Sequence, residues 1–165
     1  MKLYILRHAE AEEKHDPAAD PVRRLTSRGK SRMRDAAAGM RRFGLSFDTL
    51  LTSPFARAVQ TATIVAEAYD GKLKPRELSA LAGGVDPRDA LKALTTFADS
   101  PRLMIVGHEP QLGKLASLLV AGSPDALQVD LKKAGCIAIA IESWLAAGRG
   151  KLLWMMTPRQ LRKLR

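Results

Sequence analysis

The sequence is poor in cysteine, in aromatic residues and in long apolar runs, and each shortage excludes a class of protein. A single cysteine, Cys136, excludes an internal disulfide and any metal site built from cysteine ligands. The longest apolar stretches, residues 115–121 and 136–141, are far shorter than the roughly 20 residues of a membrane-spanning helix. Aromatic residues make up only 5% of the chain and give few platforms for stacking nucleic-acid bases. We therefore expect neither a membrane nor a nucleic acid as the main partner.

The single thiol and the first residues of the chain argue against two further features, a cysteine nucleophile and a signal peptide. Cys136 lies in an apolar run, which favours a buried structural residue over a nucleophile. Only four apolar residues separate Lys2 from Arg7, too few for the apolar region of a signal peptide, and no small-residue cleavage site follows. We therefore expect a cytoplasmic protein.

Positive charge is in excess. The chain has 27 Lys and Arg residues against 17 Asp and Glu, which gives a formal net charge of +10, and many of the basic residues lie at 23–42 and 159–165. This balance favours anionic partners such as phosphates, acidic proteins or nucleic acid, although a solvated basic face is the simpler interpretation. The 46% of hydrophobic and 27% of charged residues are typical of a globular protein, and we expect one domain over residues 1–165.

The hydrophobic pattern alternates strands with helices. Strands are predicted at residues 3–6, 47–52, 103–106, 137–141 and 151–156, with a weak candidate at 72–78 that Pro75 interrupts. Helices are predicted at residues 27–43, from Ser53-Pro54 to about 71, from Asp86-Pro87 to about 98, and at 110–121. This alternation predicts an α/β protein, a three-layer α/β/α sandwich with a mainly parallel sheet. The last two strands follow each other without a helix, which predicts an antiparallel edge.

Histidines and arginines follow three of the predicted strands. Arg7 and His8 follow the first, Arg57 lies in the helix after the second, and His108 follows the strand at 103–106. Ligands of open α/β sheets bind beyond the carboxyl ends of the strands, so we expect these side chains to converge there. Arginine matches phosphate oxygens with a planar fork of donors, and a neutral imidazole is a nucleophile that can hold a phosphoryl group. The pattern therefore indicates phosphoryl transfer.

A metal site is the competing interpretation of the two histidines, because Glu10 and Glu109 are close to them in the sequence. Two arginines beside the site would repel a divalent cation, and they already supply the positive charge that a phosphate requires. We therefore expect neither a metal nor another cofactor. The third histidine, His15, lies in a polar loop beside Lys14 and Asp16, and we expect it at the surface.

Three segments resemble the motifs of a known family. Residues 6–10 read Leu-Arg-His-Ala-Glu and resemble the motif that opens the histidine phosphatase superfamily, also called phosphoglycerate-mutase-like, although Ala9 replaces its usual glycine. Residues 51–62, which include Arg57, resemble the second block of the family, and residues 106–108 resemble the block with its second histidine. The blocks occur in the family's order, each after a predicted strand.

Within this superfamily the chain is most similar to the SixA-type phosphohistidine phosphatases, over nearly its whole length. The shared features are the compact size, the turn at residues 24–26, and residues 154–158 followed by a basic tail. The resemblance implies a phosphoglycerate-mutase-like fold in which His8 is the nucleophile. It also implies that Arg7, Arg57 and His108 form the rest of the phosphate pocket, with Ser53 as a supporting residue.

The position of a general acid stays open. Larger members of the family use a carboxylic acid to protonate the leaving oxygen, and Glu77 lies about where that acid is expected. A surface carboxylate paired with Arg76 is the other interpretation of Glu77, and Glu10 is a second candidate. The SixA-type proteins that this chain resembles lack a dedicated acid. An imidazole that leaves from phosphorus needs less help from an acid than an alkoxide does.

The resemblance implies a phosphatase that removes phosphate from a protein phosphohistidine through a phospho-His8 intermediate. The chain leaves little room for a lid, and an open site suits a phosphorylated protein better than a small sugar phosphate. A phosphatase for small phosphomonoesters, such as nucleotides or sugar phosphates, is the enzymatic alternative. The non-enzymatic alternative is a module that only binds an anionic partner. Nothing in the sequence requires a dimer, so we expect a monomer.

Overall fold

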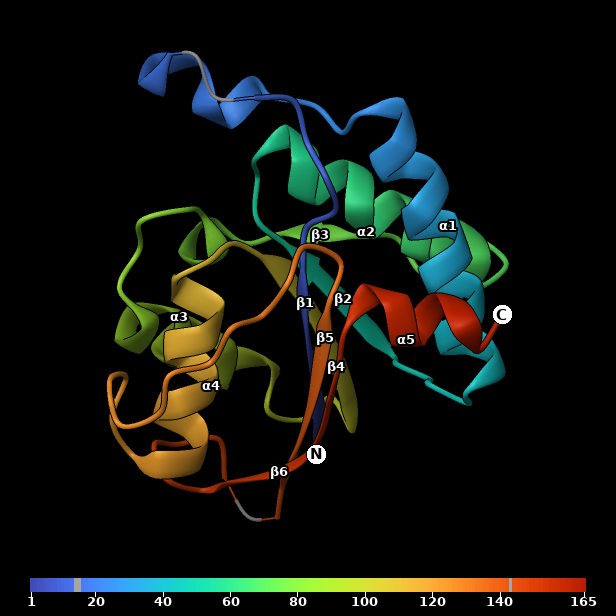
Figure 1. Ribbon diagram of the computed structural model, residues 1–165. Helices are drawn as coiled ribbons and strands as arrows, with labels where there is room; N and C mark the ends of the chain where they lie inside the picture. The colour runs from blue at the N-terminus through green and yellow to red at the C-terminus, as the bar shows by residue number, and fades with distance from the viewer. Residues whose placement is uncertain (14–15, 143) are drawn as a thin grey trace.

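A six-stranded sheet forms the middle of the molecule and carries helices on both faces (Figure 1). The computed structural model describes residues 1–13, 16–142 and 144–165. The strands are β1 (Lys2–Arg7), β2 (Thr49–Thr52), β3 (Arg76–Glu77), β4 (Arg102–Gly107), β5 (Cys136–Ile141) and β6 (Gly150–Met156), in the order β3-β2-β4-β1-β5-β6. The first four run parallel, whereas β5 pairs antiparallel with β1 and β6 antiparallel with β5. The predicted parallel sheet with an antiparallel edge is confirmed.

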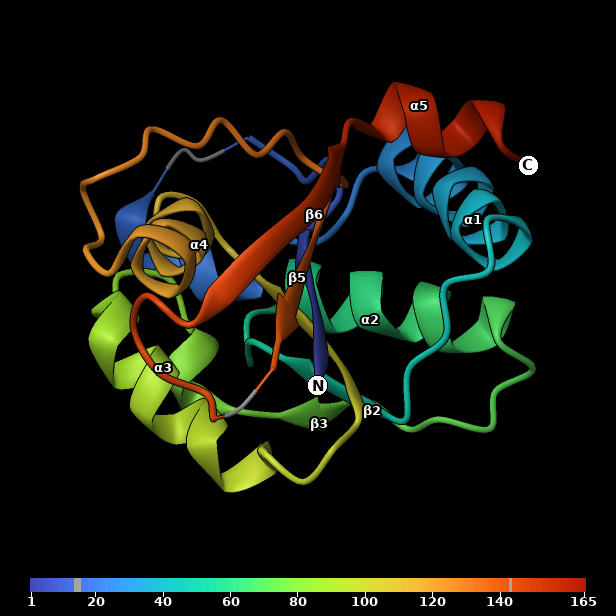
Figure 2. The same ribbon diagram turned by 90° about the horizontal axis from the view of Figure 1, so that it is seen from below.

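The helices form two layers (Figure 2). One face of the sheet carries α1 (Ser27–Arg42), α2 (Ala56–Ala68) and α5 (Pro158–Lys163), and the other carries α3 (Pro87–Leu94) and α4 (Gln111–Ala121). Short 3-10 helices lie at Pro17–Val22, Ser79–Leu81 and Thr95–Phe97. Within the described ranges, no helix is both long enough and apolar enough to cross a membrane.

Side chains that alternate along β1 build a core on each face of the sheet. Tyr4 and Leu6 belong to the apolar cluster under α1, α2 and α5, whereas Leu3 and Ile5 belong to the cluster under α3 and α4. Cys136 is fully buried in the first cluster, as its apolar surroundings in the sequence predicted. A strand buried on both faces gives the continuous apolar run that made β1 recognisable.

The order of the strands brings the ends of β1, β2 and β4 together. The end of β1 pairs Arg7 with Gly107 of β4, and the end of β2 pairs Thr52 with Val106 of β4. The three strands are parallel neighbours, so the residues that follow them emerge at one end of the sheet, opposite the N-terminus marked in Figure 1. This edge holds the predicted site.

Capping residues fix the starts of α1 and α3 where the sequence predicts them. The side chain of Thr26 accepts a hydrogen bond from Gly29 N at 2.9 Å, and that of Asp86 accepts from Arg88 N at 2.7 Å. Gly44 lies just past the end of α1 and has a φ of 85°, and this left-handed conformation stops the helix from continuing.

The predicted start of the second helix at Ser53-Pro54 is wrong. α2 begins at Ala56, and its N-cap residue Phe55 offers no side-chain cap. Ser53 Oγ accepts from Phe55 N at 3.2 Å, but the hydroxyl also lies against the ring of His108. The serine therefore belongs to a tight turn before the helix, which positions it for the site.

Among the other elements, α3 ends at Leu94 and not near residue 98, and β3 and α5 differ most from the prediction. β3 is limited to Arg76–Glu77, because Pro75 has no N–H to donate to the ladder. α5 lies in what the sequence indicated only as a basic tail. It begins with a capping box between Thr157 and Gln160, and it buries Leu161 against the core under α1.

Candidate active site

His8 follows β1 and presents a lone pair on one ring nitrogen. Its Nδ1 lies 2.7 Å from the carbonyl oxygen of Ala9, to which it donates, and Arg57 Nε donates to its Nε2 at 3.2 Å. The ring proton is therefore on Nδ1. Burial of the ring is the main cause that lowers the pKa of His8 to about 3, and the positive charges nearby add to it. His8 is a neutral imidazole at physiological pH, with Nε2 available as a nucleophile.

His108 follows β4 and faces His8, with 5.1 Å between the ring centroids. Its Nε2 lies 2.7 Å from Ser53 Oγ. That hydroxyl accepts from Phe55 N, and among the described residues it has no acceptor for its own proton except His108 Nε2. The ring proton of His108 is therefore on Nδ1, which is buried without a partner inside the described ranges. This N–H can donate to a bound anion.

Arg57 projects from the first turn of α2 and is 4% exposed. Besides the contact with His8, its Nη1 donates to the carbonyl oxygen of Asp20 at 2.6 Å and its Nη2 to the Asp20 carboxylate at 3.0 Å. Arg23 donates to the other carboxylate oxygen of Asp20 at 2.7 Å. Burial acts to raise the pKa of Asp20, but the hydrogen bonds from Arg23 and Arg57 hold it below its usual value. The Asp20 carboxylate therefore occupies the position beside the Arg57 guanidinium that a bound phosphate would take.

Arg7 and Glu109 form the other side of the site. Arg7 Nη1 donates to the carbonyl oxygen of Leu131 at 2.8 Å, while its Nε is buried without a partner in the described part of the chain. Glu109 directly follows His108, and its Oε1 is likewise buried and unpaired there. Burial raises the pKa of Glu109 to about 7, although the charge of Arg7 acts to lower it. Near neutral pH this carboxyl group exists in both protonation states.

Neighbouring side chains hold these groups in place. Thr61 Oγ1 accepts from Ala9 N at 3.0 Å and donates to the carbonyl oxygen of Arg57 at 2.7 Å, which ties the turn after β1 to α2. The ring of Phe55 lies 5.0 Å from that of His108 and 5.1 Å from the guanidinium carbon of Arg57. Packing of this kind limits the freedom of the His108 and Arg57 side chains.

The structure brings His8, Arg57, His108 and Ser53 into direct contact, and Arg7 adjoins them at the end of β1. Neither predicted acid forms a hydrogen bond or ion pair with these residues in the described part of the chain. Glu77 is exposed at the end of the edge strand β3, and Glu10 is held by Arg28 and Arg32 at 2.6 and 3.6 Å. His15 lies outside the described residues. Among the described residues, no three His, Cys, Asp or Glu side chains are grouped closely enough to hold a metal ion.

Two residues of the site were missed by reasoning from the sequence, Asp20 and Glu109. Asp20 lies in a 3-10 helix within the stretch expected to be a polar loop, and only the fold places it over Arg57. Glu109 was considered as a metal ligand and not as an acid. Its half-buried carboxylate lies against Gly113 in the first turn of α4, a contact that the sequence pattern does not reveal.

The parallel sheet brings two histidines and two arginines together at the ends of β1, β2 and β4. This combination of fold and site defines a class of α/β phosphoryl-transfer proteins, those with a histidine phosphatase fold. The sequence agrees with this class, since the model of the "Histidine phosphatase superfamily (branch 1)" matches residues 3–82. The chain belongs to the histidine phosphatase superfamily.

Similar proteins extend the match to the rest of the chain. The sequence is 37% identical over 145 residues, 84% of each protein, to an uncharacterized protein of Picosynechococcus. It is 27% identical over 164 residues, 98% of this chain and 97% of the relative, to phosphohistidine phosphatase SixA of Escherichia coli. Among solved structures, SixA complexed with tungstate has a TM-score of 0.83 at 24% identity, covering 98% of this chain and 99% of that one. A putative alpha-ribazole-5'-P phosphatase of Escherichia coli has a TM-score of 0.73 at 18% identity, covering 96% and 97%.

Proposed function

We propose that this protein is a phosphatase that removes the phosphoryl group from a phosphohistidine of another protein. The observation that carries the proposal is the unprotonated Nε2 of His8, which accepts a hydrogen bond from Arg57 Nε at 3.2 Å in a ring whose centroid is 5.1 Å from that of His108. The similarity to SixA of Escherichia coli over almost the whole chain supports the choice of phosphohistidine as substrate.

In the first step, His8 Nε2 attacks the phosphorus atom in line with the phosphorus–nitrogen bond of the substrate. That bond breaks as the new one forms, and the substrate imidazole leaves with the bonding electron pair and takes up a proton. Arg7, Arg57 and the Nδ1–H of His108 bind the phosphoryl oxygens, over which the charge of the transition state is spread. The hydrogen bond from His8 Nδ1–H to Ala9 becomes stronger as positive charge develops on the ring.

In the second step, water attacks the phosphorus atom of phospho-His8, the bond to Nε2 breaks, and inorganic phosphate leaves. The leaving group in both steps is an imidazole nitrogen, which needs little help from a general acid. The side chains of the site supply the positive charge for both steps. We therefore expect that a chelator of divalent cations leaves the rate unchanged.

A phosphatase for small phosphomonoesters is the second candidate, and the protonated fraction of Glu109 favours it. An alkoxide leaving group requires an acid, and Glu109, which follows His108 in the chain, is partly protonated near neutral pH because burial raises its pKa to about 7. Glu77 stays a candidate for the same role. Comparing the hydrolysis of phosphoramidate with that of an alkyl phosphate separates the two functions, because only the ester depends strictly on an acid.

The proposal is tested by trapping the intermediate. The protein is mixed with a phosphohistidine-bearing protein, quenched in alkali, and analysed by mass spectrometry for phosphate on His8. We expect acid-labile phosphate at this position in the wild type and none in His8→Asn, whose turnover falls by at least about 10³-fold because the nucleophile is lost.

Folding of the variant is checked by its far-UV spectrum and melting temperature. A His8→Asn protein that folds and keeps even about a tenth of the wild-type rate would contradict the assignment of the nucleophile. Fast hydrolysis of alkyl phosphates together with no turnover of phosphohistidine would support the second candidate instead.

A further inference from the structure

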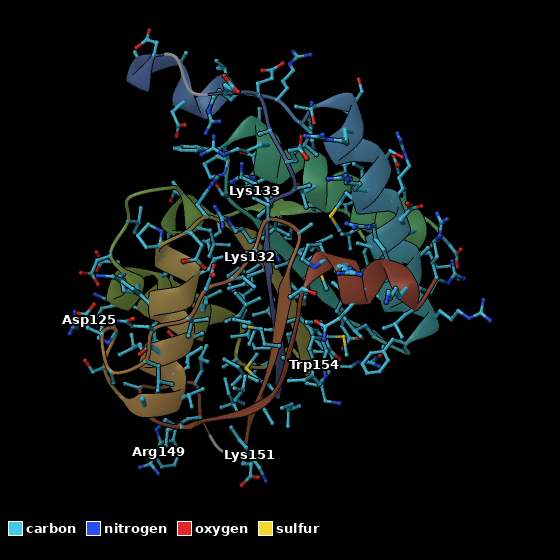
Figure 3. All side chains as sticks on the ribbon, viewed as in Figure 1. Asp125, Lys132, Lys133, Arg149, Lys151 and Trp154 are labelled. Carbon is cyan, nitrogen blue, oxygen red and sulfur yellow. The ribbon has the colours of Figure 1, made fainter. Side chains whose placement is uncertain are left out.

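A pocket of about 440 Å³ lies beside the site, between the end of β1, α1, the loop before β5, and α5. We call it the basic pocket. Its charged lining residues are Arg7, Glu10, Arg32, Lys132, Lys133 and Arg162. Figure 3 shows Lys132 and Lys133 in the loop before β5, toward the end of the sheet where β1 ends.

The charges of the basic pocket do not balance. Its one carboxylate, Glu10, is already paired with Arg28 at 2.6 Å and lies 3.6 Å from Arg32. Lys132 is paired with Asp130 at 2.5 Å, outside the pocket. Lys133 and Arg162 form no ion pair with any described residue, and their positive charges are available to a ligand. A concave surface with excess charge of one sign attracts a ligand of the opposite sign.

The basic pocket begins one residue away from the proposed nucleophile. Arg7 and Ala9, which flank His8 in the chain, both line it. Arg7 is thus shared between the phosphate site and the pocket, and its Nε is buried and unpaired in the described part of the chain. An extended polypeptide advances about 3.3–3.6 Å per residue. Side chains within a few residues of a phosphohistidine bound at His8 therefore reach the basic pocket.

We propose that the basic pocket binds an acidic side chain of the substrate polypeptide, so that the enzyme prefers phosphohistidines with Asp or Glu nearby. This inference rests on the proposed function, because the substrate must carry a polypeptide on both sides of the phosphoryl group. Carboxylates bind arginine and lysine through charge-assisted hydrogen bonds, and binding of acidic motifs by basic clusters is a recurrent mode of peptide recognition. Lys133 and Arg162 are the residues that select the acidic side chain.

The test uses two synthetic phosphohistidine peptides that differ only in flanking residues, Glu in one and Gln in the other. At low salt we expect kcat/KM to be about fivefold to tenfold higher for the Glu peptide than for the Gln peptide. The difference should come from a lower KM for the Glu peptide. The contact is made equally in the ground state and the transition state, so kcat stays the same for both peptides. The preference shrinks as the ionic strength rises from about 0.05 M to about 0.5 M.

A pair of double variants locates the effect. In Lys133→Gln/Arg162→Gln the preference for the Glu peptide falls below about twofold. In the matched control Arg149→Gln/Lys151→Gln, which removes the same number of charges, the preference stays at the wild-type value. Lys151 pairs with Ala140 of β5 near the N-terminal end of β1, at the far end of the sheet from the pocket (Figure 3).

Binding of the same peptides without phosphate, followed by fluorescence anisotropy, separates the two proposals. The inference is overturned if the pocket variant keeps the wild-type preference, or if the wild type shows none while it hydrolyses both peptides. The proposed function is overturned if neither peptide is hydrolysed, whichever of them binds more tightly. Tighter binding of the Glu peptide by the wild type and the control than by the pocket variant supports the inference independently of turnover.

Discussion

At the scale of single residues, the tautomers of the two histidines of the site depend on different neighbours. His8 donates from Nδ1 to a backbone carbonyl, so its tautomer depends on the turn after β1. The tautomer of His108 depends on one side chain, because its Nε2 lies 2.7 Å from the hydroxyl of Ser53. A single substitution can therefore change the donor that His108 presents to the phosphoryl group without touching the group that attacks.

We expect Ser53→Ala to lower kcat by about 10-fold to 100-fold with little change in KM, which corresponds to ~1.4–2.8 kcal/mol. Without the hydroxyl, His108 Nε2 is buried without a donor, and the ring is free to take the other tautomer. Steady-state kinetics and ¹⁵N chemical shifts of the His108 ring measure the two effects.

The control for this prediction is another buried serine far from the site. Ser117 Oγ donates to the carbonyl oxygen of Ser123 and accepts from Leu127 N. Ser117→Ala should lower stability and leave kcat unchanged. Ser53→Thr, which keeps a hydroxyl, should restore the His108 ring signals; an unchanged tautomer in Ser53→Ala would rule out the positioning role.

The residues of the site were predictable from the sequence where strand and chemistry coincide. His8, Arg57 and His108 each follow an apolar strand, and parallel strands end at the same edge of a sheet. Asp20 was not predictable, because its contact with Arg57 joins two segments through a 3-10 helix that has no hydrophobic period. The positions of the ring protons could not be predicted either, because they depend on hydrogen-bond distances that only the structure gives.

At the scale of helices and strands, α1 and α5 approach each other closely at Gly39. A Cβ atom at this position would lie 1.9 Å from the carbonyl oxygen of Leu161, nearer than any real contact. The missing side chain therefore lets α5 lie against α1, where Leu161 is fully buried.

We expect Gly39→Ala to lower the free energy of unfolding by about 2–4 kcal/mol, because α5 must move away from α1 and expose Leu161. Alanine favours a helix over glycine by up to about 1 kcal/mol, which offsets only part of this loss. Urea denaturation measures the difference. Ser31→Ala, an exposed position of the same helix, is the control and should be neutral or slightly stabilising; a Gly39→Ala protein of wild-type stability would contradict the close contact.

The helices and strands were predictable from the sequence to different degrees. α1 has an apolar stripe and a cap at Thr26, and β1 and β4 are apolar between their end residues, so all three were recognised close to their observed bounds. α5 is short and mostly exposed, and its pattern contains one buried residue, Leu161. Its capping box was the signal that could have identified it.

At the scale of the whole molecule, burial of two neutral histidines links stability to pH. The pKa values of His8 and His108 are lowered to about 3 by burial of the rings, whereas an unfolded histidine has its usual value of 6.5. The two rings therefore bind more protons in the unfolded chain than in the native protein between these values. Their contribution to stability is fully present above about pH 6.5 and is lost as the pH falls toward 3, whereas Glu109, whose pKa burial raises to about 7, acts in the opposite sense above its usual value of 4.5.

We expect each of these histidines to contribute a loss of about 3–5 kcal/mol across this range, enough to unfold a domain of ordinary stability in acid. Urea denaturation at a series of pH values measures the slope. In His108→Asn the slope between about pH 6.5 and pH 4 should be smaller than that of the wild type by about 1.4 kcal/mol per pH unit, the contribution of one ring. A slope equal to that of the wild type would show that His108 does not titrate as its burial requires.

The pairing of Asp20 with Arg57 gives the guanidinium a counter-ion within the protein itself. In the proposed reaction we expect the incoming phosphoryl group to exchange with this carboxylate, which returns when inorganic phosphate departs. Because the resting protein already holds an anion at Arg57, we expect inhibition by free phosphate to be weak.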